Sequence, residues 1–171
     1  MLGSLVTATC LSLLLAQASP TGSVLASRGQ FLLQGWDGTK RTAARLNESL
    51  AALEEISTEG DGALKFKLGG GLLVVVGPSS KLVLEKYEEG ADPTWHLKVA
   101  YGRVRVVADN QRVRLGAAMV ATAFQTGEVV LISEGGEAPV VALSGTVAAS
   151  GVAATGKSLN LTQGLAADFT A

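Results

Sequence analysis

The sequence predicts an all-β domain of short stacked or antiparallel strands with tight glycine turns, packed either like a solenoid or as a sandwich. Apolar and polar residues alternate over short runs, as in strands with one buried face. Turn residues recur about every eight to twelve residues, a spacing typical of all-β proteins. The 171 residues include 21 Gly and 4 Pro, and aromatic residues make up 5%. This composition favours many tight turns around a core of Ala, Val and Leu.

Each predicted strand is bounded by turn residues. The alternating run LKFKL is followed by three glycines and then by the wholly apolar run LLVVV. The sequence GPSS forms the next predicted turn, and a polar loop precedes the alternating run WHLKV. Small residues and glycines separate the last apolar runs. The predicted strands, in chain order, are residues 64–68, 72–76, 82–87, 95–99, 129–132, 140–143 and 159–161.

Residues 42–55, TAARLNESLAALEE, depart from the strand pattern. Leu46, Leu50 and Leu53 are spaced i, i+4 and i+7, which places them on one face of a helix. We therefore expect at most one short helix near residues 42–55. The end of this segment is also compatible with entry into a strand.

The N-terminal segment is predicted to be a signal peptide covering residues 1–18. It is apolar, and Ala16-Gln17-Ala18 fits a signal-peptidase site. The alternative is a retained signal anchor. Residues 22–171 are then a single exported domain, periplasmic or secreted, or anchored to the inner membrane if the segment is uncleaved. Cys10, the single cysteine, lies in this segment, so the exported domain would contain no thiol.

Residues 102–116, GRVRVVADNQRVRLG, are predicted to form a hairpin that turns at Asp109-Asn110. In that register Val104, Val106, Val113 and Leu115 face the core. The arginines face outward together, as either a solvated face neutralised by acids or a patch for an anionic partner. The candidate patch consists of Arg103, Arg105, Arg112 and Arg114.

Two further motifs suggest chemistry but are interpreted as structural. Residues 151–158, GVAATGKS, match the phosphate-binding loop G-x-x-x-x-G-K-S. The following residues alternate like a strand instead of beginning a helix, so we interpret the motif as a turn that returns residues 159–161 as a late strand. His96, the single histidine, is expected to face solvent opposite Trp95. We predict no catalytic residue, no metal site and no cofactor.

From about residue 23 to 169 the chain resembles the FecR-like domain, the extracytoplasmic β-rich module of bacterial cell-surface signalling regulators. The resemblance lies in a pattern of glycines and apolar runs. The usual W–L–G run before Leu50 is missing, as is the v–R–G–T signature within 116–126. The matching segments are residues 50–58, 61–68, 70–74, 78–84, Leu97 with 102–106, 127–131 and 161–164.

The resemblance implies a non-catalytic module for envelope sensing or protein interaction, here an isolated domain without the cytoplasmic sigma-factor-binding part. We expect a protein partner in the cell envelope, no nucleic acid, and membrane association only if the N-terminal segment is retained. One alternative is a structural β-solenoid that self-associates through strand edges. A third possibility is an exported carbohydrate-binding module that uses Trp36.

Overall fold

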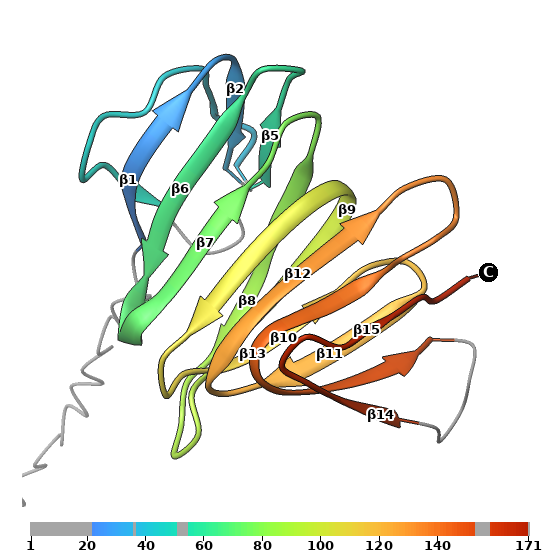
Figure 1. Cartoon of the computed structure of the whole chain (residues 1–171). Helices are drawn as coiled ribbons and strands as arrows, with labels where there is room; N and C mark the ends of the chain where they lie inside the picture. The colour runs from blue at the N-terminus through green and yellow to red at the C-terminus, as the bar shows by residue number, and fades with distance from the viewer. Residues whose placement is uncertain (1–21, 36, 51–54, 153–157, 171) are drawn as a thin grey trace, which may run out of the picture.

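The computed structural model describes residues 22–35, 37–50, 55–152 and 158–170 (Figure 1). These residues form β-strands and one short 3-10 turn, η1 (Gly69–Gly71), which confirms the predicted all-β fold. The strands are β1 (Gly22–Arg28), β2 (Phe31–Gln34), β3 (Lys40–Arg41), β4 (Ser49–Leu50), β5 (Glu55–Thr58), β6 (Ala63–Leu68), β7 (Leu72–Val76), β8 (Lys81–Glu88), β9 (Thr94–Ala108), β10 (Arg112–Gly116), β11 (Val120–Phe124), β12 (Gly127–Ser133), β13 (Val140–Gly151), β14 (Ser158–Thr162) and β15 (Ala166–Ala167).

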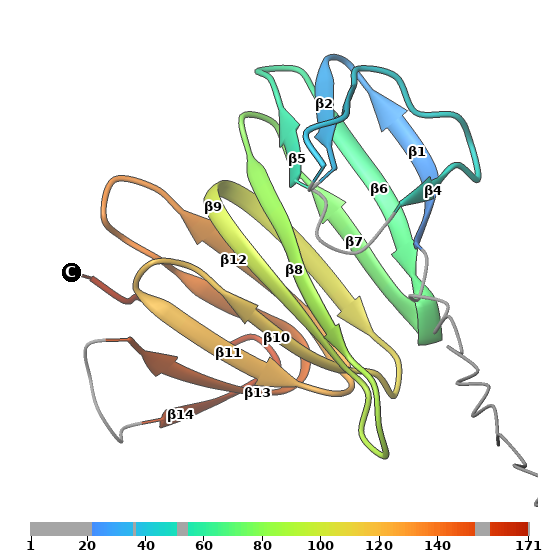
Figure 2. The ribbon, with the colours of Figure 1, turned by 180° about the vertical axis from the view of Figure 1, so that it is seen from behind.

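The strands form two sheets that lie face to face as a sandwich (Figures 1 and 2). Sheet A has the order β4-β1-β6-β7-β9-β12-β13-β15, and sheet B has the order β3-β2-β5-β8-β9-β10-β11-β13-β14. All pairings of these strands are antiparallel except β9–β10. The packing is therefore a sandwich, and the solenoid-like alternative does not describe it.

Strands β9 and β13 belong to both sheets because each bends at a glycine. The first half of β9 pairs with β8 and β10 in sheet B, and the second half, from Gly102, pairs with β12 in sheet A. Gly102 has a φ of 83°, and a Cβ there would lie 2.3 Å from Ser80 Oγ. Gly145 makes the corresponding bend in β13, with a φ of 76°. Both positions require the backbone freedom of glycine.

A single core lies between the sheets. It is built from the inward-facing residues of both, such as Val104 and Val106 from sheet A and Val113 and Leu115 from sheet B, each at most 1% exposed. The sequence-based prediction that these four side chains face the core is confirmed. The structure also confirms all the strands predicted from single apolar runs, at residues 64–68, 72–76, 82–87, 95–99, 129–132, 140–143 and 159–161.

The predicted hairpin over residues 102–116 is wrong. The second half of β9 pairs with β7 and β12, and β10 crosses to sheet B, where it runs parallel to the first half of β9. The crossing is fixed at Gln111, whose side-chain amide donates a 2.8 Å hydrogen bond to the carbonyl of Pro93. Alternation determines which side chains are buried, but it does not determine which strand is the neighbour.

The helix predicted near residues 42–55 is absent from the described part, residues 42–50. Leu46 is 69% exposed and Leu50 is fully buried, so these leucines do not share a face. Asn47 has a φ of 63°, and the Glu48 carboxylate accepts a 2.7 Å hydrogen bond from the backbone N–H of Arg45. This turn leads directly into β4, which pairs with β1. Residues 51–54 lie outside the described residues.

Candidate functional site

The four arginines of the predicted patch lie on two different sheets. Arg103 and Arg105 are on the part of β9 that belongs to sheet A, and Arg112 and Arg114 are on β10 in sheet B. All four side chains face away from the core and are exposed. Because the sheets pack face to face, the two pairs point to opposite sides of the sandwich. The single four-arginine patch is therefore wrong as a structure, and each pair must be considered with its own neighbours.

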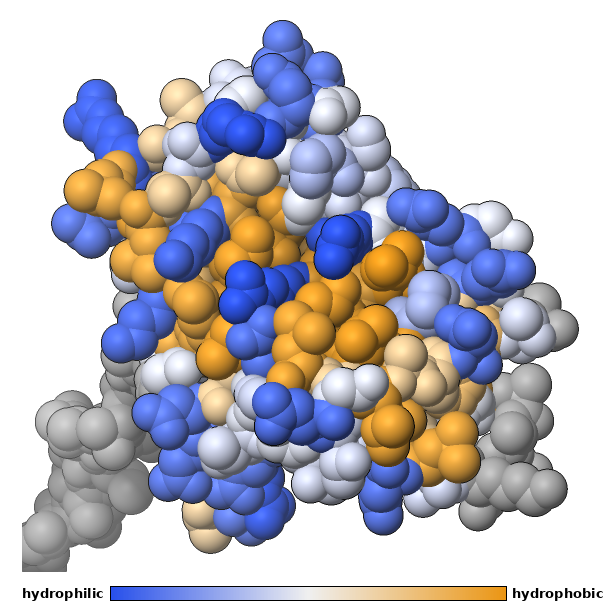
Figure 3. All heavy atoms as spheres, in the orientation of Figure 1, coloured by the Kyte–Doolittle hydropathy of each residue, from blue (hydrophilic) through white to orange (hydrophobic). Residues whose placement is uncertain are grey.

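Arg103 and Arg105 belong to an outer face that combines aliphatic and basic side chains. We call it the apolar–basic face. Figure 3 shows a broad apolar area over the middle of this side of the molecule, interrupted by strongly hydrophilic side chains. The face consists of the aliphatic residues Leu73, Val75, Val107, Val130, Ile132, Val141 and Leu143 and the cations Lys65, Lys67, Arg103 and Arg105.

Cross-strand register arranges this face in rows. The central row runs from β6 to β13 through Lys65, Val75, Arg105, Val130 and Val141, each paired with the next. Side chains paired in this way lie about 5 Å apart at Cβ, so the aliphatic groups and the cations are direct neighbours. The flanking rows contain the residues two positions along each strand, including Lys67 with Leu73 and Arg103 with Ile132.

The aliphatic residues of the apolar–basic face are packed tightly within the sheet. Val130 is only 4% exposed although the alternation of β12 points it outward. Leu143 is 41% exposed, at the β13 end of the face. Arg105 forms an ion pair with Glu128, with Nε 2.7 Å from Oε1. A surface with aliphatic groups between exposed cations is suited to binding another macromolecule.

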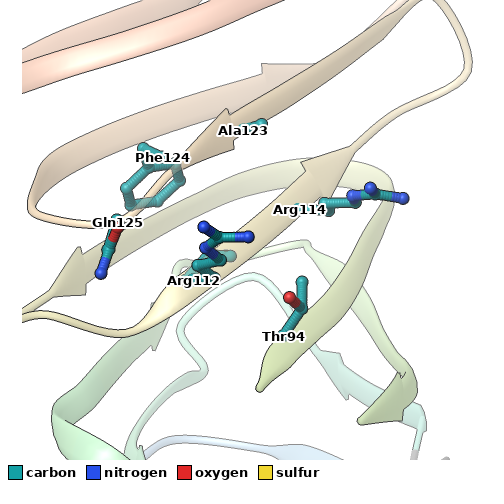
Figure 4. Close-up of a pocket in the computed structure, with 7 residues that line it drawn as sticks. Thr94, Arg112, Arg114, Ala123, Phe124 and Gln125 are labelled. Atoms are coloured by element: carbon teal, nitrogen blue, oxygen red, sulfur yellow. The ribbon is translucent and has the colours of Figure 1, made fainter. Parts of the chain in front are cut away.

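Arg112 and Arg114 instead line a shallow hollow of about 300 Å³ on the outside of sheet B (Figure 4). Arg112 is already paired with Asp92, with Nη1 3.2 Å from Oδ2. The side-chain amide of Gln125 donates a hydrogen bond to Asn110 Oδ1 at 2.9 Å. Figure 4 shows Arg114 extending away from Phe124 and Gln125. The two guanidinium groups therefore do not converge on a common ligand position.

His96 lies in the same sheet, and its predicted exposure to solvent is wrong. It faces opposite Trp95, as alternation requires, yet it is only 9% exposed. Lys86 and Arg114 flank it on the adjacent strands, and its Nε2 lies 3.0 Å from Glu88 Oε2. The hydrogen bond from Lys86 Nζ, followed by the nearby His96 ring, lowers the pKa of the Glu88 carboxyl from 4.5 to about 2.

A larger hollow of about 520 Å³ lies between β2, β5 and Tyr101. Its buried hydroxyl, that of Thr58, already donates to the carbonyl of Gly77 at 2.5 Å and accepts from the backbone N–H of Ser80 at 3.0 Å. These bonds hold the β5–β8 corner together and leave the hydroxyl little capacity for a ligand. Within the described ranges there is no group of three or more His, Cys, Asp or Glu that could hold a metal ion.

Several sequence-based predictions fall on residues that the structure does not describe. The N-terminal segment 1–18, Trp36 and the centre of the GVAATGKS motif, residues 153–157, are in this group. The strands on either side of the motif are described. β13 and β14 pair antiparallel, with Ser150 opposite Ser158, so the predicted return as a late strand is confirmed. Among the described residues no helix is long and apolar enough to cross a membrane.

The predicted arginine patch included Arg103 and Arg105 but not the aliphatic half of the apolar–basic face. The signal was present in the uninterrupted apolar runs of β7 and β12, residues 72–76 and 129–132. A strand that is apolar at every position places apolar residues on both of its faces. Because only one face of each strand can meet the core of a two-layer sandwich, such runs indicate an apolar outer face.

The sequence matches no model of a known protein family and no curated protein. The structure is similar to two crystal structures of a "putative anti-sigma factor" from Parabacteroides distasonis. Their TM-scores are both 0.54, with 13% and 12% sequence identity. In each case the match covers 68% of this chain and 59% of the other, so this chain spans less than two thirds of the length of those proteins. The similarity is one of fold.

Proposed function

We propose that this chain is a non-catalytic, extracytoplasmic module that acts in envelope sensing or signalling by binding another protein. The observation that carries the proposal is the apolar–basic face, where seven aliphatic side chains face outward between four cations. Extended apolar areas on a soluble domain mark interaction surfaces. The fold similarity to the Parabacteroides proteins agrees with a signalling role, and so does the resemblance of the sequence to FecR-like domains.

Site-specific photocrosslinking in cells that naturally produce the protein tests this function. A photoreactive residue replaces Leu143 on the apolar–basic face in one variant and Ala123 on the outside of sheet B in the other. Both side chains are exposed, so neither change should disturb the core. We expect a discrete protein adduct from position 143 and a weaker one, or none, from position 123. Equal labelling from both positions, or no adduct from position 143, would contradict the proposal.

Self-association is a second candidate function, and strand β14 favours it. In the described part of the chain β14 pairs only with β13, so its other edge is open. Its residues are exposed apart from Leu161, and Leu159 is 52% exposed. Open edges with apolar residues can pair with another chain. Large assemblies in sedimentation, with crosslinks between copies of this chain, would favour this scaffold over the signalling module.

A further inference from the structure

We propose that the apolar–basic face of sheet A binds an acidic segment of a partner protein, with apolar residues at its centre and carboxylates beside them. This inference rests on the proposed function and specifies the chemistry of the partner. Two properties of the face support it: three of its four cations have no counter-charge among the described residues, and the aliphatic residues lie in rows beside those cations.

The charge of the face is not balanced within the described part of the chain. Of its four cations, only Arg105 has an ion-pair partner there, Glu128. Lys65, Lys67 and Arg103 have none among the described residues. Four cations against the single carboxylate of Glu128 give a local charge of +3, whereas the whole chain has a formal net charge of −1. A partner that binds here must therefore supply negative charge to be electrostatically complementary.

The arrangement of the cations also indicates where that charge should be. Lys65 and Lys67 lie on β6, at one side of the aliphatic rows, and Arg103 and Arg105 lie within them on β9. Strands are about 4.8 Å apart, so Lys65 and Arg105, which share the central row, are separated by roughly 10 Å across β7. Val75 lies between them. A complementary segment would present carboxylates on both sides of an apolar ridge.

Two occupants from this chain fit the face poorly. A second copy that docked through the same face would bring cations against cations, because a two-fold interface is self-complementary. The N-terminal segment is apolar enough to cover aliphatic residues, but residues 1–27 contain no Asp or Glu to neutralise the cations. Neither occupant supplies the missing negative charge.

An anionic membrane surface would supply charge, but the shape of the face does not favour it. Insertion into a bilayer needs apolar side chains that protrude beyond the polar groups. Here most aliphatic side chains are buried or half-buried: Val130 is 4% exposed, and of the seven only Leu143, at the β13 end, is exposed, at 41%. The cations beside them are long and exposed. A protein surface can follow this relief and contact both kinds of side chain.

Charge reversal combined with crosslinking from position 143 tests the inference. The double substitution Lys65→Glu and Lys67→Glu reverses two exposed cations. Lys98→Glu, an exposed lysine on the outside of sheet B, is the matched control. We expect the double variant to reduce the adduct by roughly tenfold or more and the control to retain it, because like charges across an interface cost affinity. Thermal unfolding checks that each variant is folded.

Mass spectrometry of the adduct then identifies the partner segment that contacts the face. We expect Asp or Glu residues flanking apolar ones, and we expect replacing those acids by Lys to restore the adduct with the double variant. A crosslinked segment without acids, an adduct unchanged by charge reversal, or a crosslink to this chain itself would overturn the partner chemistry while leaving protein binding intact. Absence of any protein adduct would contradict the proposed function as well.

A vesicle experiment tests whether anionic lipid, and not a protein, supplies the negative charge. The full chain is sedimented with vesicles of phosphatidylcholine alone and with vesicles that also contain phosphatidylglycerol. We expect no difference between the two in the amount of protein that sediments. Binding to the anionic vesicles that is lost in the Lys65→Glu, Lys67→Glu variant would show that this face contacts lipid, and would overturn the inference.

Discussion

The outer faces of the two sheets differ although they share strand β9. On sheet A the central row runs through Lys65, Val75, Arg105, Val130 and Val141, so aliphatic side chains are the direct neighbours of two cations. The corresponding row on sheet B contains small or polar side chains. It runs through Lys86, His96, Arg114, Ala123, Ala148 and Asn160.

Charge pairing differs less sharply. On sheet B, Lys81 pairs with Glu55, Lys86 with Glu88 and Arg112 with Asp92, whereas Lys98 and Arg114 have no ion-pair partner among the described residues. Most cations of the apolar–basic face have no such partner in the described structure. The cations without a partner lie among large aliphatic side chains on sheet A and among small or polar side chains on sheet B. The two outer faces therefore differ mainly in apolar character, and the apolar–basic face is the one that combines large aliphatic groups with unpaired cations in the described structure.

The largest expected effect comes from a substitution at Gly102, where β9 bends from sheet B into sheet A. Gly102→Ala places a Cβ 2.3 Å from Ser80 Oγ and 2.5 Å from the Ser79 carbonyl, at a φ of 83°. We expect a loss of about 2–4 kcal/mol in the free energy of unfolding, from backbone strain together with the steric clash. Urea unfolding measures it.

Gly38→Ala is the matched control, because Gly38 has the same φ of 83° but nothing within 4 Å of the added Cβ. Gly38→Ala should lower the free energy of unfolding by only about 1 kcal/mol, from backbone strain alone. If both variants lost the same stability, the close approach of β9 to the Ser79–Ser80 turn would not be what requires glycine at 102.

The second prediction concerns the apolar character that distinguishes the faces. Replacing Val75, Val107 and Val141 by Thr keeps the β-branched shape but adds hydroxyls to the outer face of sheet A. We expect binding of a fluorescent hydrophobic dye to fall several-fold. Each substitution should change the free energy of unfolding by no more than about 0.5 kcal/mol, since none of these side chains faces the core.

Val83→Thr on the outside of sheet B is the control for this measurement, because Val83 is also half-buried and faces outward. It should leave dye fluorescence nearly unchanged. A fall of similar size in the control would mean that the apolar surface is not concentrated on sheet A.

Sequence patterns were sufficient for the parts of the fold that depend on local alternation. The burial of Val104, Val106, Val113 and Leu115 follows from period two, whichever strands are neighbours. The pairing of β10 with the first half of β9 does not follow, because it depends on a crossing between sheets fixed by Gln111 and Pro93, which lie far apart in sequence. The predicted arginine patch was wrong for the same reason, because it assumed that β10 pairs with the second half of β9.

The burial of His96 was unpredictable for a similar reason. Alternation placed it correctly on the outer side of its strand, but the cover comes from the long side chains of other strands. Which long side chains surround a position is a property of register. Single-sequence patterns carry little information about it.

The smallest expected effect concerns the paired charges of sheet B, where the pKa of Glu88 is lowered to about 2. A carboxyl whose pKa is lower in the folded state stabilises the fold above its unfolded pKa. That contribution is complete above about pH 4.5 and is lost as the pH falls toward 2. The Glu88→Gln variant should therefore differ from the parent in melting temperature at neutral pH, and the difference should shrink between pH 4.5 and 2. Glu89→Gln, an exposed neighbour, is the control. If the difference for Glu88→Gln were constant across this range, the Lys86–Glu88–His96 cluster would add no stability, and the contrast in charge pairing between the two faces would have no energetic consequence.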